Sequence, residues 1–438
     1  MRIFFSGIGG TGIGPLALIA KQAGYEVSGS DKQNSQYIEY LKDHGIPDIY
    51  IGQTTENITK HHQAKHIDWY VYSSAVEKEN PNHPELIYVD QNNIKKSKRD
   101  ELLNYILEEK KLDLLAVAGT HGKTTTTAML IYLLKSLATP LSYSVGAKIS
   151  FGEMGHFTPD AKLFALEADE FDRNFLSFSP YMAIISGISY DHHEIYPTQE
   201  SYNQAFIDFL SKSQFKIIWR SDLDKLNIET DSSYTILDDN DPNIAKINLP
   251  GLVNKRDAWL VCVAVSRLIG KDPSLLGTIM SKFPGVSRRM EQIADNLYSD
   301  YAHTTDKIIG AIDIAQEIAN NKQSQLVVIY EPLTNRRMHH TIKDHYNIFE
   351  GVNKLYWVPS YLAREDPNQH VLSPDELIAQ ISPTAQSKAE SAIFDDNLKN
   401  KIIQHLQNGD TVLALSGGGG GSLDEWLREK LSVISRST

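Results

Sequence analysis

Cysteine is almost absent from the sequence, with Cys262 alone among 438 residues. A single cysteine excludes a disulfide framework within the chain and is typical of a protein kept in a reducing compartment. Because Cys262 lies in an apolar stretch of helical character, AWLVCVAVSRL, we expect a small core side chain there rather than a reactive thiol. These observations predict a cytoplasmic protein.

Long apolar runs are also missing. No stretch of the sequence approaches the roughly 18 residues that a membrane-spanning helix needs. The first residues, MRIFFSGIGG, lead directly into a strand and a glycine loop without a cleavage-site pattern. We therefore expect neither a signal peptide nor membrane insertion.

Basic residues are in the minority, since 43 lysines and arginines stand against 55 acids and give a net charge of −12. An acidic surface repels nucleic-acid backbones, so we expect no nucleic-acid partner. The strongest local exception is the basic run KKSKR at 95–99. We interpret this run as a solvated loop or the start of a helix.

Strand-like and helix-like segments alternate along the whole chain. RIFFSGI and YEVSGSD have the pattern of buried strands, and GPLALIAKQAG between them has that of a helix. This alternation predicts α/β domains with parallel sheets. Since 438 residues are too many for one ordinary core, we place boundaries in the charged segment 106–113 and in the turn KFPGVS at 282–287. The predicted domains are 1–107, 108–284 and 285–438.

The first glycine loop lies in FFSGIGGTGIG, near the N-terminus. Gly7, Gly9 and Gly12 satisfy the G-x-G-x-x-G spacing between a strand and a helix, and Asp31 ends the next strand. Glycines let the backbone approach a pyrophosphate, and the acid bonds a ribose hydroxyl. This pattern favours a dinucleotide site, but the loop itself requires only a diphosphate, which a UDP-sugar also carries. The alternative is a glycine turn that binds no ligand and only allows the strand and the helix to pack closely.

The second glycine loop is AGTHGKTT at 118–125. It is a shortened form of the G-x-x-x-x-G-K-[ST] phosphate loop, because Val117 occupies the position of the first glycine. It keeps backbone N–H groups to surround phosphate, Lys123 for the β and γ oxygens and the Thr124 hydroxyl for Mg²⁺. A dehydrogenase has no use for such a loop in a second domain, whereas a ligase with a nucleotide-linked substrate needs two phosphate sites. We therefore favour a ligase over a nicotinamide-dependent oxidoreductase.

Acids and histidines follow two strands of the central segment. FALEADEFD places Glu167, Asp169, Glu170 and Asp172 at one strand end, and YDHHEIY follows the next strand. Because the carboxyl ends of parallel strands meet at one edge of a sheet, we expect a metal ligand among these side chains. For any single one of them, a surface acid or a helix cap is the plainer alternative. Neither H-x-x-x-H spacing nor a nearby cysteine supports zinc.

In this order the motifs resemble those of the Mur ligase family, the ATP-dependent amide ligases that build the peptide stem of peptidoglycan. The segments that carry the resemblance extend over nearly the whole chain and are GIGGTGIG, SGSD, YSSAV, NPNHPEL, GTHGKTT, EADEFD, YDHHEIYP, FPGVSRRME, DYAHT and GDTVLALSGGG. The resemblance implies a Rossmann-like UDP-sugar domain, a central P-loop ATPase-type domain and a Rossmann-like C-terminal domain. It implies ATP and Mg²⁺ as cofactors and a reaction that joins L-alanine, or a peptide, to UDP-N-acetylmuramate through an acyl phosphate.

The resemblance also implies a set of site residues. For the UDP-sugar they are Gly7, Gly9, Gly10, Thr11, Gly12, Asp31, Ser73 and Ser74. For ATP they are Gly119, Thr120, His121, Gly122, Lys123, Thr124, Thr125, Asn254 and Asp300. The Mg²⁺ positions are Thr124, Glu167 and His192, the catalytic ones Lys123, His192 and Arg289, and those for the amino acid His303 and Arg337.

Three positions depart from the family pattern. Gly187 stands where an asparagine is expected, Val253 where a histidine is, and Thr334 where the alanine-adding branch has an arginine. The E-P-x-x-N spacing around Thr334 is that of a related ligase, which reattaches recycled tripeptide to UDP-N-acetylmuramate. That ligase and a non-catalytic nucleotide-binding homologue are therefore the alternatives. We expect a monomer or a homodimer.

Overall fold

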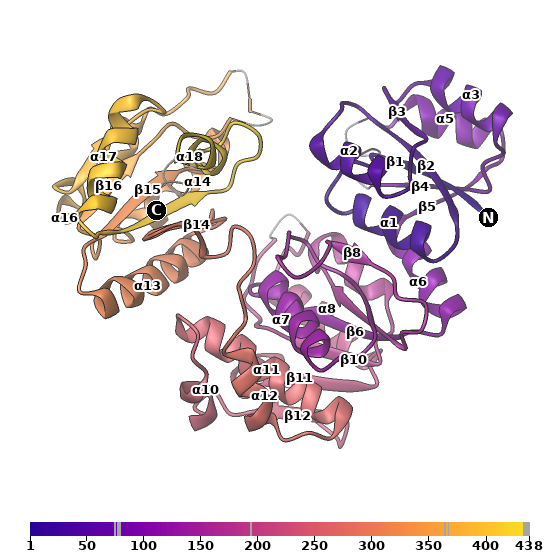
Figure 1. The fold of residues 1–438 in the computed structure, drawn as a ribbon, viewed down its shortest axis with the longest axis horizontal. Coiled ribbons are helices and arrows are strands. Elements are labelled where there is room, and N and C mark those ends of the chain that lie inside the picture. The colour runs from indigo at the N-terminus through magenta and orange to yellow at the C-terminus, as the bar shows by residue number, and fades with distance from the viewer. Residues whose placement is uncertain (74–75, 77–79, 193–194, 363–364, 367, 432–438) are drawn as a thin grey trace. The chain divides into compact units, whose positions relative to one another are not determined.

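The computed structural model describes residues 1–73, 76, 80–192, 195–362, 365–366 and 368–431. The chain forms two compact units, Met1–Ile247 with Arg256–Phe283 and Asn248–Lys255 with Pro284–Thr438. The first unit contains two sheets and the second contains one (Figure 1).

The first sheet has five parallel strands in the order β3-β2-β1-β4-β5. Its strands are β1 (Arg2–Ser6), β2 (Glu26–Asp31), β3 (Ile49–Ile51), β4 (Trp69–Tyr72) and β5 (Lys95–Lys98). Its helices are α1 (Gly14–Gln22), α2 (Gln36–Asp43), α3 (Thr55–Ala64), α5 (Pro84–Gln91) and α6 (Arg99–Lys110). The strand order reverses beside β1, and loops that follow strands at such a point form ligand crevices. The first glycine loop follows β1.

The second sheet has the order β12-β11-β10-β6-β9-β7-β8 and is parallel except for the pair β7–β8. Its strands are β6 (Asp113–Ala118), β7 (Leu141–Ser144), β8 (Gly155–His156), β9 (Leu163–Glu167), β10 (Met182–Ile185), β11 (Phe215–Trp219) and β12 (Tyr234–Leu237). Its helices are α7 (Lys123–Ser136), η1 (Phe171–Ser177), α8 (Gln199–Ser211), α9 (Arg220–Leu226), α10 (Pro242–Lys246), α11 (Leu252–Ile269) and α12 (Pro273–Met280). Because β6 lies between β9 and β10, the phosphate loop after β6 is flanked by the segments that follow those two strands.

One apolar core joins the two sheets of the first unit. It includes Ile19 of α1, Ile106 of α6 and Phe164 of β9. At the contact between α1 and β8, a Cβ on Gly155 would lie 2.5 Å from the Pro15 carbonyl oxygen, so the approach of the two backbones requires a glycine. The start of α1, and with it the first glycine loop, is therefore held against the second sheet.

The second unit is built on a six-stranded sheet in the order β13-β14-β18-β15-β16-β17, parallel except for β13–β14. Its strands are β13 (Glu291–Ala294), β14 (Leu297–Asp300), β15 (Leu326–Glu331), β16 (Lys354–Trp357), β17 (Ala389–Ser391) and β18 (Thr411–Ser416). Its helices are α13 (Thr305–Lys322), α14 (Asn335–Thr341), η2 (Ile342–His345), α15 (Pro374–Ile378), α16 (Pro383–Gln386), α17 (Asp396–Gln407) and α18 (Leu423–Leu431). The central strands β15 and β18 are buried along their whole length, as expected for parallel strands covered on both faces.

The α/β class with predominantly parallel sheets is confirmed, whereas the exact domain limits stay a prediction. The interpretation of 95–99 as a solvated loop is wrong for Lys95–Lys98, which form β5, but Arg99 does begin a helix. Cys262 is fully buried, and burial raises the pKa of its thiol to about 12, as expected for a core residue. Among the helices described, none has the length and apolarity to cross a bilayer.

Candidate active site

The first glycine loop is held in place by β2. The N–H groups of Gly7 and Ile8 donate to the Ser30 carbonyl at 2.8 and 3.0 Å, and the Gly9 N–H donates to the Asp31 carboxylate at 2.8 Å. Gly7 has a φ of +75°, a conformation that favours glycine. The Asp31 carboxylate therefore fixes the loop, a function that the sequence did not indicate.

The remaining residues predicted for the sugar lie at the same edge of the first sheet. Gly10 donates to the Gly7 carbonyl at 3.0 Å, which closes the turn, and Thr11 and Gly12 line a cavity. Ser73 directly follows β4, the strand next to β1. Ser74 lies outside the described residues. The assignment of this group to a UDP-sugar stays a prediction.

The second glycine loop joins β6 to α7 in a tight turn. Gly119 and Gly122 have φ values of +147° and +77°. Side chains at either position would meet neighbours, since a Cβ on Gly119 would overlap Ser186 Oγ and one on Gly122 would lie 2.8 Å from Asp257 Oδ2. The Thr120 N–H donates to the Gly187 carbonyl at 2.8 Å. The loop thus places the N-terminus of α7 at the sheet edge, as a phosphate site requires.

Its other members have separate contacts. The His121 carbonyl accepts from Ser186 Oγ at 2.5 Å. Thr125 lies in the first turn of α7, and Gly187, where the family pattern has an asparagine, has no neighbour within 4 Å of its Cβ position. The nucleotide contacts expected of this loop stay predictions.

Lys123 is engaged by acids of the EADEFD segment. Its Nζ donates to the Gly119 carbonyl at 2.8 Å and forms an ion pair with Glu170 Oε2 at 2.7 Å. The other oxygen of Glu170 lies 3.4 Å from His192 Nε2. Glu170 is fully buried, which opposes its ionisation, but the contacts with His192 and Lys123 outweigh burial and lower its pKa. A buried carboxylate therefore joins the two predicted catalytic residues of this unit.

Glu170 is a residue to which the sequence reasoning gave no individual function. It stood as one of four acids after a buried strand. The structure buries Glu170 fully and leaves Asp169 and Asp172 partly exposed, and the backbone then turns at Asp172 and Arg173, which have left-handed φ values of 59° and 60°. No local pattern announces such a turn.

Thr124 and Glu167 form a hydroxyl–carboxylate pair. Thr124 Oγ1 donates to Glu167 Oε1 at 2.7 Å, and the Gly146 N–H donates to Glu167 Oε2 at 2.7 Å. Within the described parts of the chain, no cluster of three or more His, Cys, Asp or Glu side chains is placed to hold a metal ion. The pair nevertheless fits Mg²⁺, which is usually bound by one or two protein oxygens together with substrate phosphates and water. His192, the third predicted ligand, contacts Glu170 instead.

A cavity of about 220 Å³ in the first unit extends from the first glycine loop to Glu167, the hydrogen-bond partner of Thr124. Its lining includes Thr11 and Gly12 from the first glycine loop, and Gly146 and Glu167 from the second sheet. Arg99, at the start of α6, lies in the same wall. Arg99 is not among the site residues predicted from the sequence, because in the sequence it is only the last residue of the basic run 95–99.

In the second unit, the predicted site residues gather after β14. The buried Asp300 accepts hydrogen bonds from the N–H groups of Met290 and Ala302, each at 2.8 Å, and burial raises its pKa. The Arg289 guanidinium lies 5.2 Å from the centre of the Tyr301 ring. Asp300 therefore ties the segment that carries Arg289 to the end of β14.

His303 and Arg337 are in contact. Arg337 Nη1 donates to the His303 carbonyl at 3.3 Å, and His303 Nδ1 donates to the Tyr301 carbonyl at 2.7 Å. Burial and the nearby positive charges, first Lys307 and then Arg337 and Arg289, lower the pKa of His303 to about 3. The imidazole is therefore neutral near pH 7 in a positively charged environment, and that environment favours an anionic ligand.

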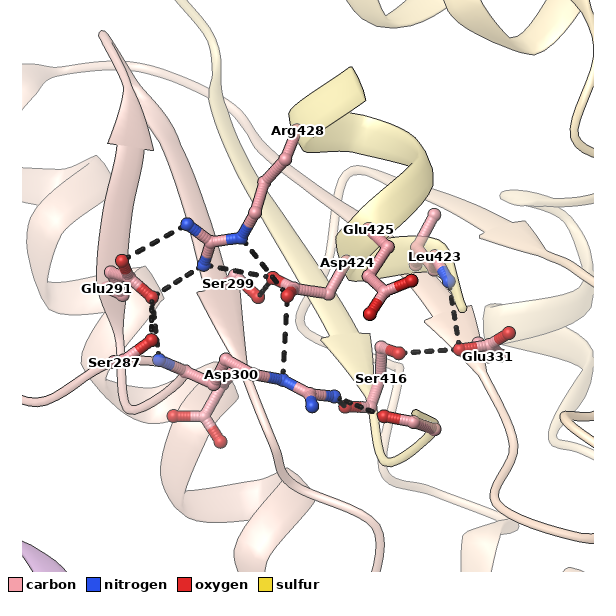
Figure 2. Close-up of polar contacts among 12 residues, drawn as sticks. Ser287, Glu291, Ser299, Asp300, Glu331, Ser416, Leu423, Asp424, Glu425 and Arg428 are labelled. Carbon is pink, nitrogen blue, oxygen red and sulfur yellow. Dashed lines mark hydrogen bonds and ion pairs between the residues drawn. The ribbon is translucent and has the colours of Figure 1, made fainter. Parts of the chain in front are cut away.

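The glycine-rich segment after β18 is held by a polar cluster, most of which Figure 2 shows. Glu331 accepts from Ser416 Oγ at 2.5 Å and from the Leu423 N–H at 3.1 Å. Arg288 donates to the carbonyls of Ser416 and Gly418 at 2.8 and 2.7 Å. Of the two adjacent arginines in SRRME, Arg288 therefore supports the backbone of the glycine-rich segment after β18.

The same cluster fastens α18 to the start of the sheet. Arg428 pairs with Glu291 at 2.6 Å and with Asp424 at 3.1 Å, and Asp424 accepts from Ser299 Oγ (Figure 2). Arg428 holds the pKa of Glu291 below its usual value against the effect of burial. Because these charges satisfy one another, we assign this part of the cluster to structure rather than to ligand binding.

Asn254 and Thr334 have local hydrogen-bond partners. Asn254, in the part of α11 that belongs to the second unit, donates to the Pro250 carbonyl at 2.9 Å. Its neighbour Val253 is exposed. Thr334 caps α14 and accepts from the Arg337 N–H at 3.3 Å, so it supports the helix that carries Arg337.

Two family models match the chain, the Mur ligase family catalytic domain over residues 2–111 and the Mur ligase middle domain over 117–238. Together they cover more than half of the sequence. Among curated relatives, the UDP-N-acetylmuramate–L-alanine ligase of Clostridium acetobutylicum is 28% identical over an alignment of 452 positions, which covers 95% of this chain and 95% of its own. The enzyme of the same name from Caldicellulosiruptor bescii is 28% identical over 95% of this chain and 96% of its own.

Solved structures share the fold. The UDP-N-acetylmuramate–alanine ligase of Thermotoga maritima superimposes with a TM-score of 0.76 at 21% identity, and all of both chains is covered. A murein peptide ligase from Psychrobacter arcticus gives a TM-score of 0.58 at 21% identity over all of this chain and 99% of its own. At these identities the likeness shows the arrangement of the elements and no more.

Proposed function

The chain belongs to the Mur ligase family, and from this premise we propose that it joins L-alanine to UDP-N-acetylmuramate in peptidoglycan precursor synthesis. The energy comes from ATP, which is converted to ADP and phosphate. The carboxylate of the sugar attacks the γ-phosphate, and the amine of alanine then displaces phosphate from the acyl phosphate. Activation is needed because a free carboxylate is a poor acceptor for an amine.

The cavity of the first unit is the observation that carries the proposal. Its wall contains Gly12 of the first glycine loop and Glu167, which is hydrogen-bonded to Thr124 of the second. A sugar nucleotide on the first loop would thus present its carboxylate beside a triphosphate on the second. Positioning of this kind supplies much of the catalysis in phosphoryl transfer.

Lys123 is the group that stabilises charge in the proposed mechanism. Its Nζ is paired with Glu170 at 2.7 Å in the structure, within reach of the loop that would hold phosphates. When ATP binds, Lys123 exchanges this carboxylate for phosphate oxygens and stabilises the charge that develops on the transferred group. Thr124 and Glu167 would hold Mg²⁺, which would neutralise further phosphate charge. Glu170 keeps His192 in place during the exchange.

The second unit supplies the acceptor site in this proposal. The charges of Arg289, Lys307 and Arg337 act on His303, and the Thr304 hydroxyl at the start of α13 is buried without a hydrogen-bond partner among the described residues. A helix N-terminus beside cations favours a carboxylate. We propose that the carboxylate of the incoming amino acid binds there.

A phosphate-release assay tests the proposed function. The protein is mixed with ATP, Mg²⁺ and UDP-N-acetylmuramate, and L-alanine, glycine, L-serine or the tripeptide of peptidoglycan is then added. We expect release with L-alanine, and mass spectrometry should show the sugar nucleotide extended by one alanine. Release with tripeptide alone would replace the proposal by the recycling ligase, and no release with any acceptor would favour a non-catalytic protein.

A further inference from the structure

Arg99 occupies an unusual position beneath the first glycine loop. It begins α6 directly after β5, the edge strand next to β4. Its Cζ lies 3.5 Å from the position of a Cβ on Gly12, and its Nη1 would overlap that atom. A glycine at position 12 therefore leaves space for the Arg99 guanidinium, and any larger side chain there would displace it.

Arg99 lines a cavity together with acidic residues but forms no ion pair with any of the described residues. It is the one basic side chain among the described residues that line the cavity, beside the acids Asp100, Glu167 and Asp169. Across the described part of the chain, no carboxylate lies within ion-pair distance of it. A partly buried guanidinium without an internal partner is a strong site for an oxyanion, because its planar fork can donate two parallel hydrogen bonds.

We propose that Arg99 binds the anionic part of the sugar nucleotide, either its diphosphate or its carboxylate. The inference rests on the proposed function, since that function supplies the sugar nucleotide. Arg99 borders both Gly12, where a diphosphate would meet the loop, and the wall that contains Glu167. Arg99 would bind the sugar nucleotide in the cavity. The acids of the same wall would repel an anion that has no contact with Arg99.

Binding measurements with Arg99→Gln test the inference. Calorimetry compares UMP, UDP, UDP-N-acetylglucosamine and UDP-N-acetylmuramate on the wild type, Arg99→Gln, Arg99→Lys and Lys96→Gln. Lys96 is the matched control, since it lies in the same basic run but pairs with Asp90 at 2.6 Å at the surface. We expect Arg99→Gln to weaken UDP-N-acetylmuramate binding by roughly 10-fold or more, the usual loss for a charged hydrogen bond, and Lys96→Gln to have no effect.

The panel of ligands identifies the anion. An equal loss for UDP and both UDP-sugars with UMP less affected would assign Arg99 to the diphosphate. A loss confined to UDP-N-acetylmuramate would assign it to the carboxylate. Unchanged binding by Arg99→Gln, or an equal loss in Lys96→Gln, would overturn the inference. Arg99→Lys, which keeps the charge but not the planar fork, should bind more weakly than the wild type and more tightly than Arg99→Gln. Should Arg99→Gln fail to fold in thermal melts, Arg99→Met takes its place, because it keeps the aliphatic stem without the charge, and wild-type affinity in that variant would equally overturn the inference.

These measurements do not depend on ligase activity. If the wild type binds UDP through Arg99 but releases no phosphate with any acceptor, the proposed function fails and the binding role of Arg99 stands. If the wild type is an active ligase and Arg99→Gln has an unchanged KM for UDP-N-acetylmuramate, the inference fails and the function stands. With the inference correct, the KM for the sugar nucleotide rises while the KM for ATP is unchanged.

Discussion

The two glycine loops of the first unit have the same strand–turn–helix form but handle charge in opposite ways. In the first loop the acid Asp31 binds the Gly9 N–H, and the cation Arg99 has no ion-pair partner among the described residues. In the second loop the cation Lys123 is paired with the buried Glu170. The first loop therefore has an arginine ready for an anion, whereas the second has to exchange a carboxylate for phosphate.

This difference relates to the two ligands we propose. A donor that stays bound through the reaction suits a fixed loop and a fixed arginine. ATP gives up its γ-phosphoryl group during the reaction, so the lysine that binds it needs an alternative partner. Lys123 can pair with Glu170 again when the product leaves. Four substitutions test the comparison, and they are ordered by expected effect.

Lys123→Ala should have the largest effect. Without the ammonium group the charge on the transferred phosphoryl is unscreened, so we expect kcat to fall by at least about 10³-fold. Calorimetry with UDP-N-acetylmuramate should give wild-type affinity, because the sugar loop follows β1 in the other sheet. Loss of sugar binding together with turnover would contradict the separation of the two loops.

Glu170→Gln should mainly destabilise the fold. Removing one partner of a buried ion pair leaves an uncompensated charge, at a cost of about 3–5 kcal/mol. The pKa of Glu170 is lowered in the folded state, so its contribution is complete above the pKa of an unfolded glutamate and is lost as pH falls through the folded value.

Thermal melts at neutral and acid pH check this expectation. The melting temperature of Glu170→Gln should lie well below that of the wild type at pH 7 and approach it at acid pH. Glu229→Gln is the control, because Glu229 is exposed in the segment between α9 and β12. A gap between Glu170→Gln and wild type that is constant with pH would show that the charge of Glu170 does not stabilise the second loop.

Gly12→Ala should have a smaller effect, confined to the donor. The added methyl group would displace the Arg99 guanidinium, so we expect the KM for UDP-N-acetylmuramate to rise by roughly 5- to 10-fold, about 1 kcal/mol. In the Arg99→Gln background the same change should add almost nothing, since coupled residues are not additive. Fully additive effects in this cycle would mean that Gly12 acts independently of Arg99.

Asp257→Asn should have the smallest effect and the opposite sign. Asp257 is buried beside Gly122, and burial raises its pKa well above the usual value. The folded state then binds more protons than the unfolded state above the pKa of an unfolded aspartate, so stability falls as pH rises through that window. The amide should raise the free energy of unfolding at pH 8 by up to about 1 kcal/mol.

Denaturant titrations at pH 4 and pH 8 measure this change. The advantage of Asp257→Asn over the wild type should shrink at pH 4, because the buried Asp257 carboxyl of the folded wild type is protonated there. Equal free energies of unfolding for the two proteins at pH 8 would show that ionisation of Asp257 does not destabilise the folded state.

Much of the site was predictable because its signals are local. Gly7, Gly119 and Gly122 mark turns whose left-handed backbone the residue type itself reveals. Glu167 ends one apolar strand and Thr124 lies just after the loop that follows another, and parallel strands bring such positions to one edge, where the two side chains meet at 2.7 Å. Asp31 was correctly placed beside the first loop, although its observed partner there is the Gly9 N–H.

Other parts were not predictable, because they depend on the packing of distant segments. Arg99 lies beneath Gly12 only because β5 pairs at the edge of the first sheet and α6 begins there. Glu170 is fully buried and lies 2.7 Å from Lys123 Nζ, whereas its neighbour Asp169 is partly exposed and lies 4.0 Å from the same atom. Arg288 and Arg289 are adjacent in sequence, but it is Arg288 that donates hydrogen bonds to the Ser416 and Gly418 carbonyls and so supports the backbone there.

The sequence by itself determined that this protein has α/β domains with two phosphate-type loops of different chemistry, because glycine spacing and strand–helix alternation are local properties of the chain. Only the tertiary structure decided which charges meet. Lys123 pairs with Glu170, and Arg99 is left without such a partner in the described residues, because ion pairs and cavities form between segments that the fold brings together. The identity of each side chain is written in the sequence, but its electrostatic partner is a property of the packed molecule.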